Sequence, residues 1–171
     1  DGDLDLFLCG YVHFDREKAR HRPMVAGRPA VWTNPVSYDP LPSILMRNNG
    51  NGVFDDVTEE AGVANPAGKS MQALFCDFNN DGWQDLYVAN DVGTADAMFQ
   101  NNGDGTFADV STLSGTFDRR ASMGVAIGDV WHEGMMDLFT THWVNEDHAL
   151  WRNQSATTPD NSILLEDVGP T

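Results

Sequence analysis

Residues 77–88 read Asp-Phe-Asn-Asn-Asp-Gly-Trp-Gln-Asp-Leu-Tyr-Val, an acidic loop that runs directly into an apolar segment. The second part of this pattern occurs two more times. Residues 1–8 read Asp-Gly-Asp-Leu-Asp-Leu-Phe-Leu, and residues 133–140 read Glu-Gly-Met-Met-Asp-Leu-Phe-Thr. Because Asp137 stands about 50 residues after Asp85, the recurrence indicates a structural repeat of that length.

Two further blocks repeat with the same spacing. Residues 47–57 and 100–110 share the pattern Asn-Asn-Gly-x-Gly-x-Phe, and a third copy is eroded after Trp-Arg-Asn at 151–153. Residues 69–77 also align with residues 120–129, and both segments end in the aspartate that opens an acidic loop. The repeat therefore extends through the whole unit and is not confined to one acidic motif.

Short predicted strands separated by turns fill the second repeat. Apolar or alternating segments at 71–76, 85–89, 97–101 and 106–110 predict four antiparallel strands. Asn-Gly-Asp-Gly at 102–105 is a strong hairpin signal, because Asn-Gly and Asp-Gly accept positive φ angles. A unit of about 50 residues with four short strands is typical of a propeller blade. The predicted fold is an all-β β-propeller of four-stranded antiparallel blades.

About three blades fit into the chain. Residues 1–68 are predicted to form a blade that lacks its first strand and carries an inserted Pro- and Arg-rich arm at about 11–43. Residues 69–118 form a complete blade, and residues 119–171 form the third. Three blades cannot close a ring, since propellers have at least about four. We therefore expect this chain to be a fragment of a longer propeller.

The acidic loop at 77–85 has the composition of a calcium site. It reads D-x-N-x-D-G-x-x-D, so oxygen-bearing side chains stand at positions 1, 3, 5 and 9 of a turn in which Gly82 permits a sharp reversal. Calcium prefers six to eight oxygen ligands, including backbone carbonyls. The predicted ligands are the side chains of Asp77, Asn79, Asp81 and Asp85 and the carbonyl of Trp83. The alternative is an acidic hairpin turn that binds no metal.

An EF-hand is excluded for this loop. An EF-hand needs a bidentate glutamate at position 12 on an outgoing helix, whereas position 12 here is Val88 inside a predicted strand. The first copy of the loop is seen in part, and its predicted contributors are Asp1, Asp3 and Asp5. The third copy is degenerate, because Trp131 at position 3 offers no side-chain oxygen. Its remaining candidates are Asp129, Glu133 and Asp137, in a structural hairpin or a weak site.

These blocks together resemble the FG-GAP/VCBS repeat superfamily of calcium-loop propellers, which includes integrin α-subunit head repeats. They look most like bacterial proteins related to cartilage acidic protein, which carry UnbV/ASPIC domains. The resemblance rests on Val-Ala-Ile-Gly-Asp at 125–129, the acidic loops and the Asn-Asn-Gly blocks, and it covers nearly the whole chain. It implies a secreted or surface protein with a seven-bladed propeller. No Phe-Gly or Gly-Ala-Pro motif is present, so integrin-like ligand binding is not implied.

Charge limits the classes of partner. The chain has 26 acidic and 10 basic residues and a net charge of −16, which argues against nucleic acid and against anionic membrane surfaces. No apolar run approaches the length of a membrane span. The expected partners are other protein chains or the rest of the same propeller, with carbohydrate as a further possibility because several tryptophans could stack on sugars. The expected location is extracellular, at the cell surface or periplasmic.

The inserted arm holds half of the basic residues. Its prolines disfavour regular sheet pairing, and long loops on rigid scaffolds often carry function. One hypothesis is that the arm contacts an acidic partner, and the other is that it packs on a neighbouring blade or pairs with local acids. The candidate partner-binding residues are Arg16, Lys18, Arg20, Arg22 and Arg28.

Three functions are compatible with these observations. The first is a non-catalytic, calcium-stiffened propeller for adhesion or protein interaction. The second is an enzyme or enzyme subunit that acts on carbohydrate or another extracellular substrate, which would require convergent acid and base residues outside the metal loops. The sequence shows no such pair. The third is a scaffold subunit in a larger assembly. Calcium is the only cofactor that the sequence predicts.

Overall fold

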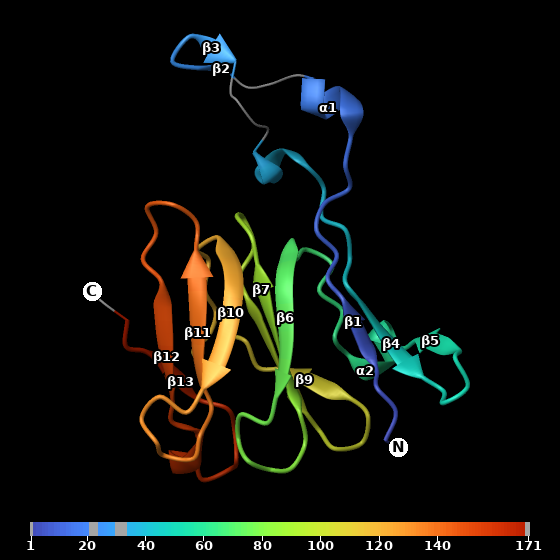
Figure 1. The fold of residues 1–171 in the computed structure, drawn as a ribbon, viewed down its shortest axis with the longest axis vertical. Coiled ribbons are helices and arrows are strands. Elements are labelled where there is room, and N and C mark those ends of the chain that lie inside the picture. Colours follow the sequence, from blue (N-terminus) through green and yellow to red (C-terminus); the bar gives the residue numbers. More distant parts are fainter. Residues whose placement is uncertain (1, 21–23, 30–33, 170–171) are drawn as a thin grey trace.

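The computed structural model describes residues 2–20, 24–29 and 34–169. Three antiparallel sheets of three, four and four strands form the body (Figure 1). The first contains β1 (Leu6–Leu8), β4 (Ile44–Asn48) and β5 (Phe54–Asp56). The second contains β6 (Ser70–Cys76), β7 (Asp85–Asn90), β8 (Ala97–Asn101) and β9 (Phe107–Asp109). The third contains β10 (Ser122–Gly128), β11 (Asp137–His142), β12 (Ala149–Asn153) and β13 (Leu165–Asp167). The expectation of an all-β, antiparallel fold is confirmed.

The core lies between consecutive sheets, and β7 shows why. Every residue of this strand is buried. Because side chains alternate along a strand, Leu86 and Val88 join a cluster with residues of the first sheet, while Tyr87 and Ala89 join a second cluster with residues of the third sheet. The second sheet is thus apolar on both faces and is covered on both faces by its neighbours.

Strands β6 and β10 lie side by side at one edge of the stacked sheets (Figure 1). The Gln72 side chain joins them, because its Nε2 donates to the Val125 carbonyl at 3.3 Å and its Oε1 accepts from the Val125 N–H at 3.1 Å. A polar side chain therefore satisfies backbone groups of the neighbouring sheet at a place where the two strands do not form a ladder.

The arm is an insertion between two paired strands. In the first sheet Leu6 pairs with Met46 and Leu8 with Ile44, so the chain leaves after β1 and returns at β4. Near the body its two legs are joined at 2.8 Å from the His13 N–H to the Asp39 carbonyl. Beyond them lie the helix α1 (Arg16–Arg20), the hairpin β2–β3 (Met24–Val25 and Arg28–Pro29) and the 3-10 turn η1 (Pro35–Ser37). The helix and the hairpin project away from the sheets (Figure 1).

Two short helical elements follow strands of the outer sheets. The helix α2 (Thr58–Ala61) comes after β5, and the 3-10 turn η2 (Ser155–Thr157) comes after β12. Before α2, the carboxylate of Asp56 accepts from the Thr58 backbone N–H at 3.1 Å and from the Thr58 hydroxyl at 2.6 Å. These local bonds replace the missing ladder partners at the end of β5 and turn the chain toward the second sheet.

Candidate metal centre

The acidic loop 77–85 connects β6 to β7 and makes a tight reversal. Asn80 and Gly82 adopt left-handed φ angles of 57° and 93°, which glycine and asparagine accept most readily. The Asp77 carboxylate holds the reversal closed, because it accepts from the N–H of Asp81 at 3.1 Å and from the N–H of Gly82 at 2.9 Å. The first predicted ligand therefore already faces the interior of the turn.

The middle of the loop brings two further predicted ligands together. The Asn79 amide donates to the Asp81 carboxylate at 2.9 Å, and the same carboxylate accepts from the Trp83 N–H at 2.8 Å. Asn79 is nearly buried and also donates to the Asn161 carbonyl at 2.8 Å, which ties the loop to the third repeat. The positions of Asn79 and Asp81 are thus fixed by contacts on both sides of the loop.

Asp85, the last predicted ligand, is fully buried at the start of β7. Burial raises the pKa of this carboxyl to about 6, backbone hydrogen bonds from Asn101 and Phe78 oppose the shift, and the negative charges of Asp81 and Asp77 add to it. Its two oxygens accept those N–H groups at 2.9 Å each. The loop therefore concentrates like charges whose repulsion a cation would relieve.

The donor chemistry of this loop fits calcium. Every predicted donor is a hard oxygen from a carboxylate, an amide or a carbonyl. Among the residues that the structure describes, no three Asp, Glu, His or Cys side chains meet as a metal-binding group. A calcium ion here would therefore need the Asn79 amide and the Trp83 carbonyl as well as the carboxylates.

The third loop keeps the fold of the second but has Trp131 in place of the side-chain ligand at position 3. Asp129 accepts from the N–H groups of Glu133 and Gly134 at 2.8 and 3.0 Å, as Asp77 does in the second loop. Asp137 accepts from Val130 and Asn153 at 2.8 and 2.9 Å, as Asp85 does from its own neighbours. The aspartates at positions 1 and 9 of both loops thus have a structural task besides any metal binding.

An arginine supplies the positive charge in the third loop. The Arg152 guanidinium forms an ion pair with Glu133, and it lies over the Trp131 ring at 5.3 Å from the ring centre. In the second repeat the equivalent of Arg152 is Gln100, which is uncharged. The third loop therefore has an internal cation where the second loop has none.

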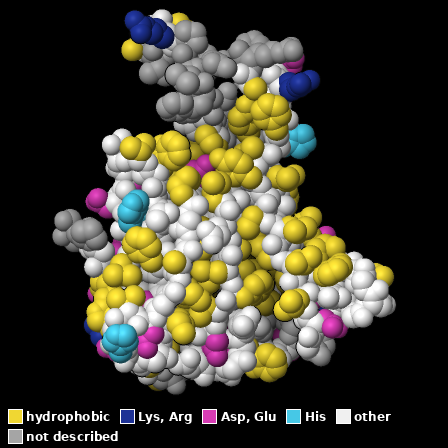
Figure 2. Space-filling model, viewed as in Figure 1, with side chains coloured by type: hydrophobic (Ala, Val, Ile, Leu, Met, Phe, Trp, Pro, Cys, Tyr) yellow, Lys and Arg dark blue, Asp and Glu magenta, His cyan; other side chains and the backbone are white. Residues whose placement is uncertain are grey.

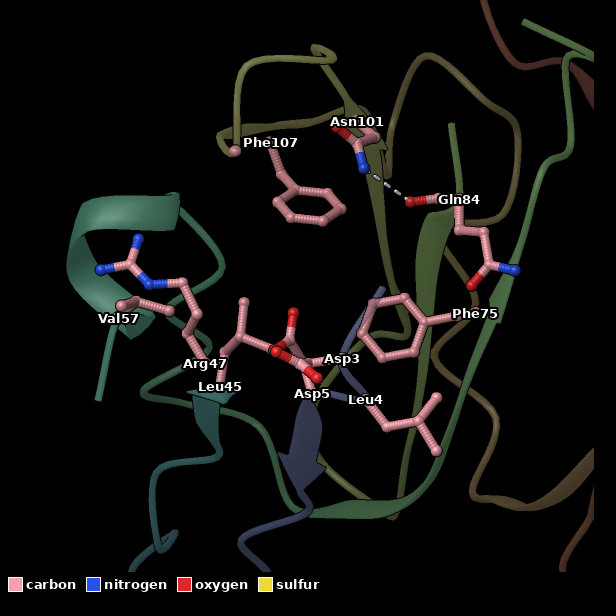
Figure 3. A pocket seen from close by; sticks show the side chains of 11 residues that line it. Asp3, Leu4, Asp5, Leu45, Arg47, Val57, Phe75, Gln84, Asn101 and Phe107 are labelled. Atoms are coloured by element: carbon pink, nitrogen blue, oxygen red, sulfur yellow. Dashed lines mark hydrogen bonds between the residues drawn. The ribbon is translucent and has the colours of Figure 1, made fainter. Parts of the chain in front are cut away.

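The first loop lies in a cavity of about 400 Å³ between the first and second sheets. Figure 3 shows Asp3 and Asp5 side by side in this cavity, with Phe75 and Phe107 also lining it. Asp5 accepts from the Asn48 N–H at 2.8 Å, in the manner of Asp85 and Asp137. The third predicted contributor, Asp1, is outside the described residues.

A repeated asparagine completes each loop, and its role was not predicted. Asn48, Asn101 and Asn153 each donate a backbone N–H to the last aspartate of the preceding loop. Their side-chain amides donate to the carbonyls of Leu4, Gln84 and Met136 at 3.2, 2.9 and 2.9 Å. The signal is present in the sequence as the recurring asparagine of the Asn-Asn-Gly blocks, but the hairpin turn that follows it explains the same residue type.

The basic residues of the arm belong to different elements. Arg16, Lys18 and Arg20 lie on α1 and Arg28 lies on β3, while Arg22 is outside the described residues. Lys18 pairs with Asp39 at 3.2 Å, within the arm itself and on its exposed surface. Figure 2 shows basic side chains at two separate places on the arm. Partner binding by these residues stays a prediction.

The two cysteines of the chain, Cys9 and Cys76, are both free thiols and form no bridge with each other. Cys9 is exposed and Cys76 is buried. His142 is also buried, with its Nδ1 at 2.7 Å from the Asp147 carbonyl and its Nε2 at 3.2 Å from the Asp118 carboxylate. Cys76 ends β6 directly before the acidic loop, whereas His142 belongs to the packing of the third sheet.

Comparison with protein families matches the FG-GAP-like repeat over residues 1–88 and 77–140. The chain belongs to the FG-GAP-like repeat family. Among curated proteins it is 31% identical over 121 residues to human cartilage acidic protein 1, and 31% identical over 123 residues to the mouse protein of the same name. These matches cover 70% and 71% of this chain but 18% of each relative. In the described part of the chain, no helix is long and apolar enough to span a membrane.

Proposed function

We propose that this FG-GAP-like chain is part of a calcium-stabilised β-propeller that serves as a protein-interaction module outside the cell. The second loop carries the metal proposal. It has an all-oxygen donor set, a reversal already closed by Asp77 and a buried Asp85 surrounded by like charge. A bound calcium ion would neutralise these carboxylates and stiffen the link between β6 and β7.

The propeller proposal is supported by the flanks of the outer sheets. The second sheet is covered on both sides, whereas large apolar side chains on or beside the first and third sheets remain exposed. They include Leu4, Leu6, Leu8, Met136, Phe139 and Val168. Further blades would cover such flanks in the same way that the first and third sheets cover the second. The proposed ring has seven blades, as the family resemblance implies.

The extracellular, protein-binding part of the proposal rests on the family and on the name of the relatives. Cartilage acidic protein 1 is named for an extracellular tissue and for its acidity, and this chain is likewise strongly acidic, with a net charge of −16.

Calcium titration by calorimetry tests the metal site. Asp81→Asn removes one charge from the second loop and keeps an oxygen for the Trp83 N–H, and Glu133→Gln is the matched change in the third loop. We expect the wild-type chain to bind with a Kd of roughly 10⁻⁴–10⁻³ M, the range of extracellular modules. Binding should weaken at least about tenfold in Asp81→Asn and stay unchanged in Glu133→Gln. Equal effects of the two variants, or no binding by the wild type, would refute the proposed site.

A further inference from the structure

A second cavity, of about 300 Å³, lies at the opposite end of the sheets from the acidic loops. Strand β6 runs from this cavity at Met71 to the calcium loop after Cys76, so the two sites are separated by the length of the strand. The apolar part of the lining also includes Met123 of β10 and Trp143, which follows β11, together with Pro35, Val92 and Ala121. Figure 2 shows hydrophobic side chains around an acidic one at this end of the body, where it meets the arm.

Two carboxylates from different turns line the same cavity. Glu146 follows β11, and its Oε2 accepts from the Ala121 N–H at 2.8 Å, which fixes the side chain in place. Asp91 follows β7, and it accepts from the Tyr11 hydroxyl at 2.5 Å and from the Val92 N–H at 2.7 Å. Both carboxylates are thus held rigidly by neutral donors.

No basic side chain neutralises these two acids within the described residues. The ion pairs of the described part of the chain involve other carboxylates, and Arg120, the basic residue nearest in sequence to Ala121, is bound to Asp118 and Asp167. The described lining of the cavity thus holds two carboxylates and no basic side chain beside its apolar walls. Trp143 and Met71 remain 51% and 40% exposed, so their surfaces are available to a ligand.

Such a lining fits a cation carried on an apolar stem. An aromatic face attracts a cation, and apolar walls strengthen the attraction of the carboxylates by excluding water. A guanidinium binds best to both oxygens of one carboxylate, but Glu146 has one oxygen engaged by Ala121 and Asp91 has both engaged. An ammonium is a compact point donor that can bind the one remaining carboxylate oxygen, Oε1 of Glu146.

We propose that this cavity binds the ammonium group of a lysine side chain from a partner protein. The alkyl stem would lie against Met71 and Met123, and the ammonium would meet Trp143, Glu146 and Asp91. This inference deepens the proposed function, because it rests on the chain being a protein-interaction module and names the chemistry of the contact. It does not depend on calcium, since the acidic loops are at the other end of the strands.

The test is a titration of the whole chain, labelled with ¹³C at the methionine methyl groups, followed by NMR. The probe is Nα-acetyl-lysine methylamide. The controls are the norleucine analogue, which has the stem without the charge, and the arginine analogue. We expect the lysine probe to cause saturable shifts of the Met71 and Met123 methyl signals. Both controls should bind at least about tenfold more weakly. Met98, which is fully buried, reports whether the fold is intact.

Two variants complete the test. Glu146→Gln keeps the oxygen that accepts from Ala121 and removes the charge, and Trp143→Ala truncates a half-exposed ring. Each should weaken lysine binding about tenfold while leaving the Met98 signal unchanged, and Asp81→Asn should leave lysine binding intact. Absence of saturable shifts, equal binding of the norleucine or arginine analogue, or full binding by Glu146→Gln would overturn the proposal. Loss of calcium binding with retained lysine binding would refute the metal site alone.

Discussion

Replacing Asn153 with alanine should disrupt the joint between the second acidic loop and the third sheet. The Asn153 amide donates to the Phe78 carbonyl at 2.8 Å and to the Met136 carbonyl at 2.9 Å, and its oxygen accepts from the Ser155 N–H at 2.9 Å. The residue is 3% exposed, so water cannot take over these bonds. The variant would leave the buried Phe78 carbonyl and the partly buried Met136 carbonyl without this donor.

The expected magnitude follows from the three bonds. A hydrogen bond contributes a net 0.5–1.5 kcal/mol, and a buried group left unpaired costs more, so Asn153→Ala should lower the free energy of unfolding by about 3 kcal/mol. Asn101→Ala is the matched control at the equivalent position of the second repeat. Asn101 is half-buried and its side chain makes two bonds, to Gln84 and Gly103, so its loss should cost about 1 kcal/mol.

Urea unfolding at a fixed calcium concentration measures both variants. The midpoint should fall with little change in the m value, because neither change alters the surface that unfolding exposes. For a chain of this size a loss of about 3 kcal/mol corresponds to a decrease in Tm of roughly 6–12 °C. If Asn153→Ala were no more destabilising than Asn101→Ala, the reasoning from burial and cross-repeat bonding would be wrong.

Three other measurements test separate parts of the structure. Burial raises the pKa of Asp96 from 3.8 to about 6, so its contribution to stability is full below about pH 4 and is lost as the pH rises through about 6. Asp96→Asn should therefore flatten the dependence of the urea midpoint on pH between about pH 4 and 7, measured in EGTA. An unchanged slope of the midpoint against pH would contradict this. A thiol reagent should modify exposed Cys9 first and Cys76 only after unfolding, because burial raises the pKa of Cys76 to about 11; equal rates would be inconsistent with the packing. Gly115→Ala should lower the free energy of unfolding by about 2 kcal/mol or more, because Gly115 has a φ of 84° and a Cβ there would stand 2.4 Å from the Leu165 carbonyl oxygen. Gly105→Ala, which has open space around it, should cost about 1 kcal/mol. Similar losses in the two variants would count against the close approach at Gly115.

Most strands could be predicted because their signals are local. The predicted segment 97–101 coincides with β8, and 71–76 and 85–89 each fall one residue short of the observed strands β6 and β7. Alternating apolar residues and Asn-Gly or Asp-Gly turns act within a few positions, so one sequence contains them in full. The helix α1 was missed because five residues are too few to show helical periodicity, and its start depends on Asp15, which accepts from the Glu17 N–H at 2.8 Å.

The character of each acidic loop could be predicted only in part. Trp131 indicates in the sequence that the third loop lacks one of the predicted ligands, but the cation that pairs with Glu133 is Arg152, which lies in another strand. The structural bonds of Asp85 and Asp137 were also hidden, because their donors follow a whole strand later, at Asn101 and Asn153. Such pairs depend on strand register, which the spacing of acidic residues does not reveal.

Thermal unfolding with excess calcium and then with EGTA tests the central claim most directly. A ligand at 100 times its Kd stabilises the folded state by about 2.7 kcal/mol, which for this chain corresponds to a rise in Tm of roughly 5–11 °C. We predict this rise for the wild-type chain and for Glu133→Gln, and its loss in Asp81→Asn. An equal Tm in calcium and EGTA, or a rise that persists in Asp81→Asn, would contradict the account of the second loop as a calcium site.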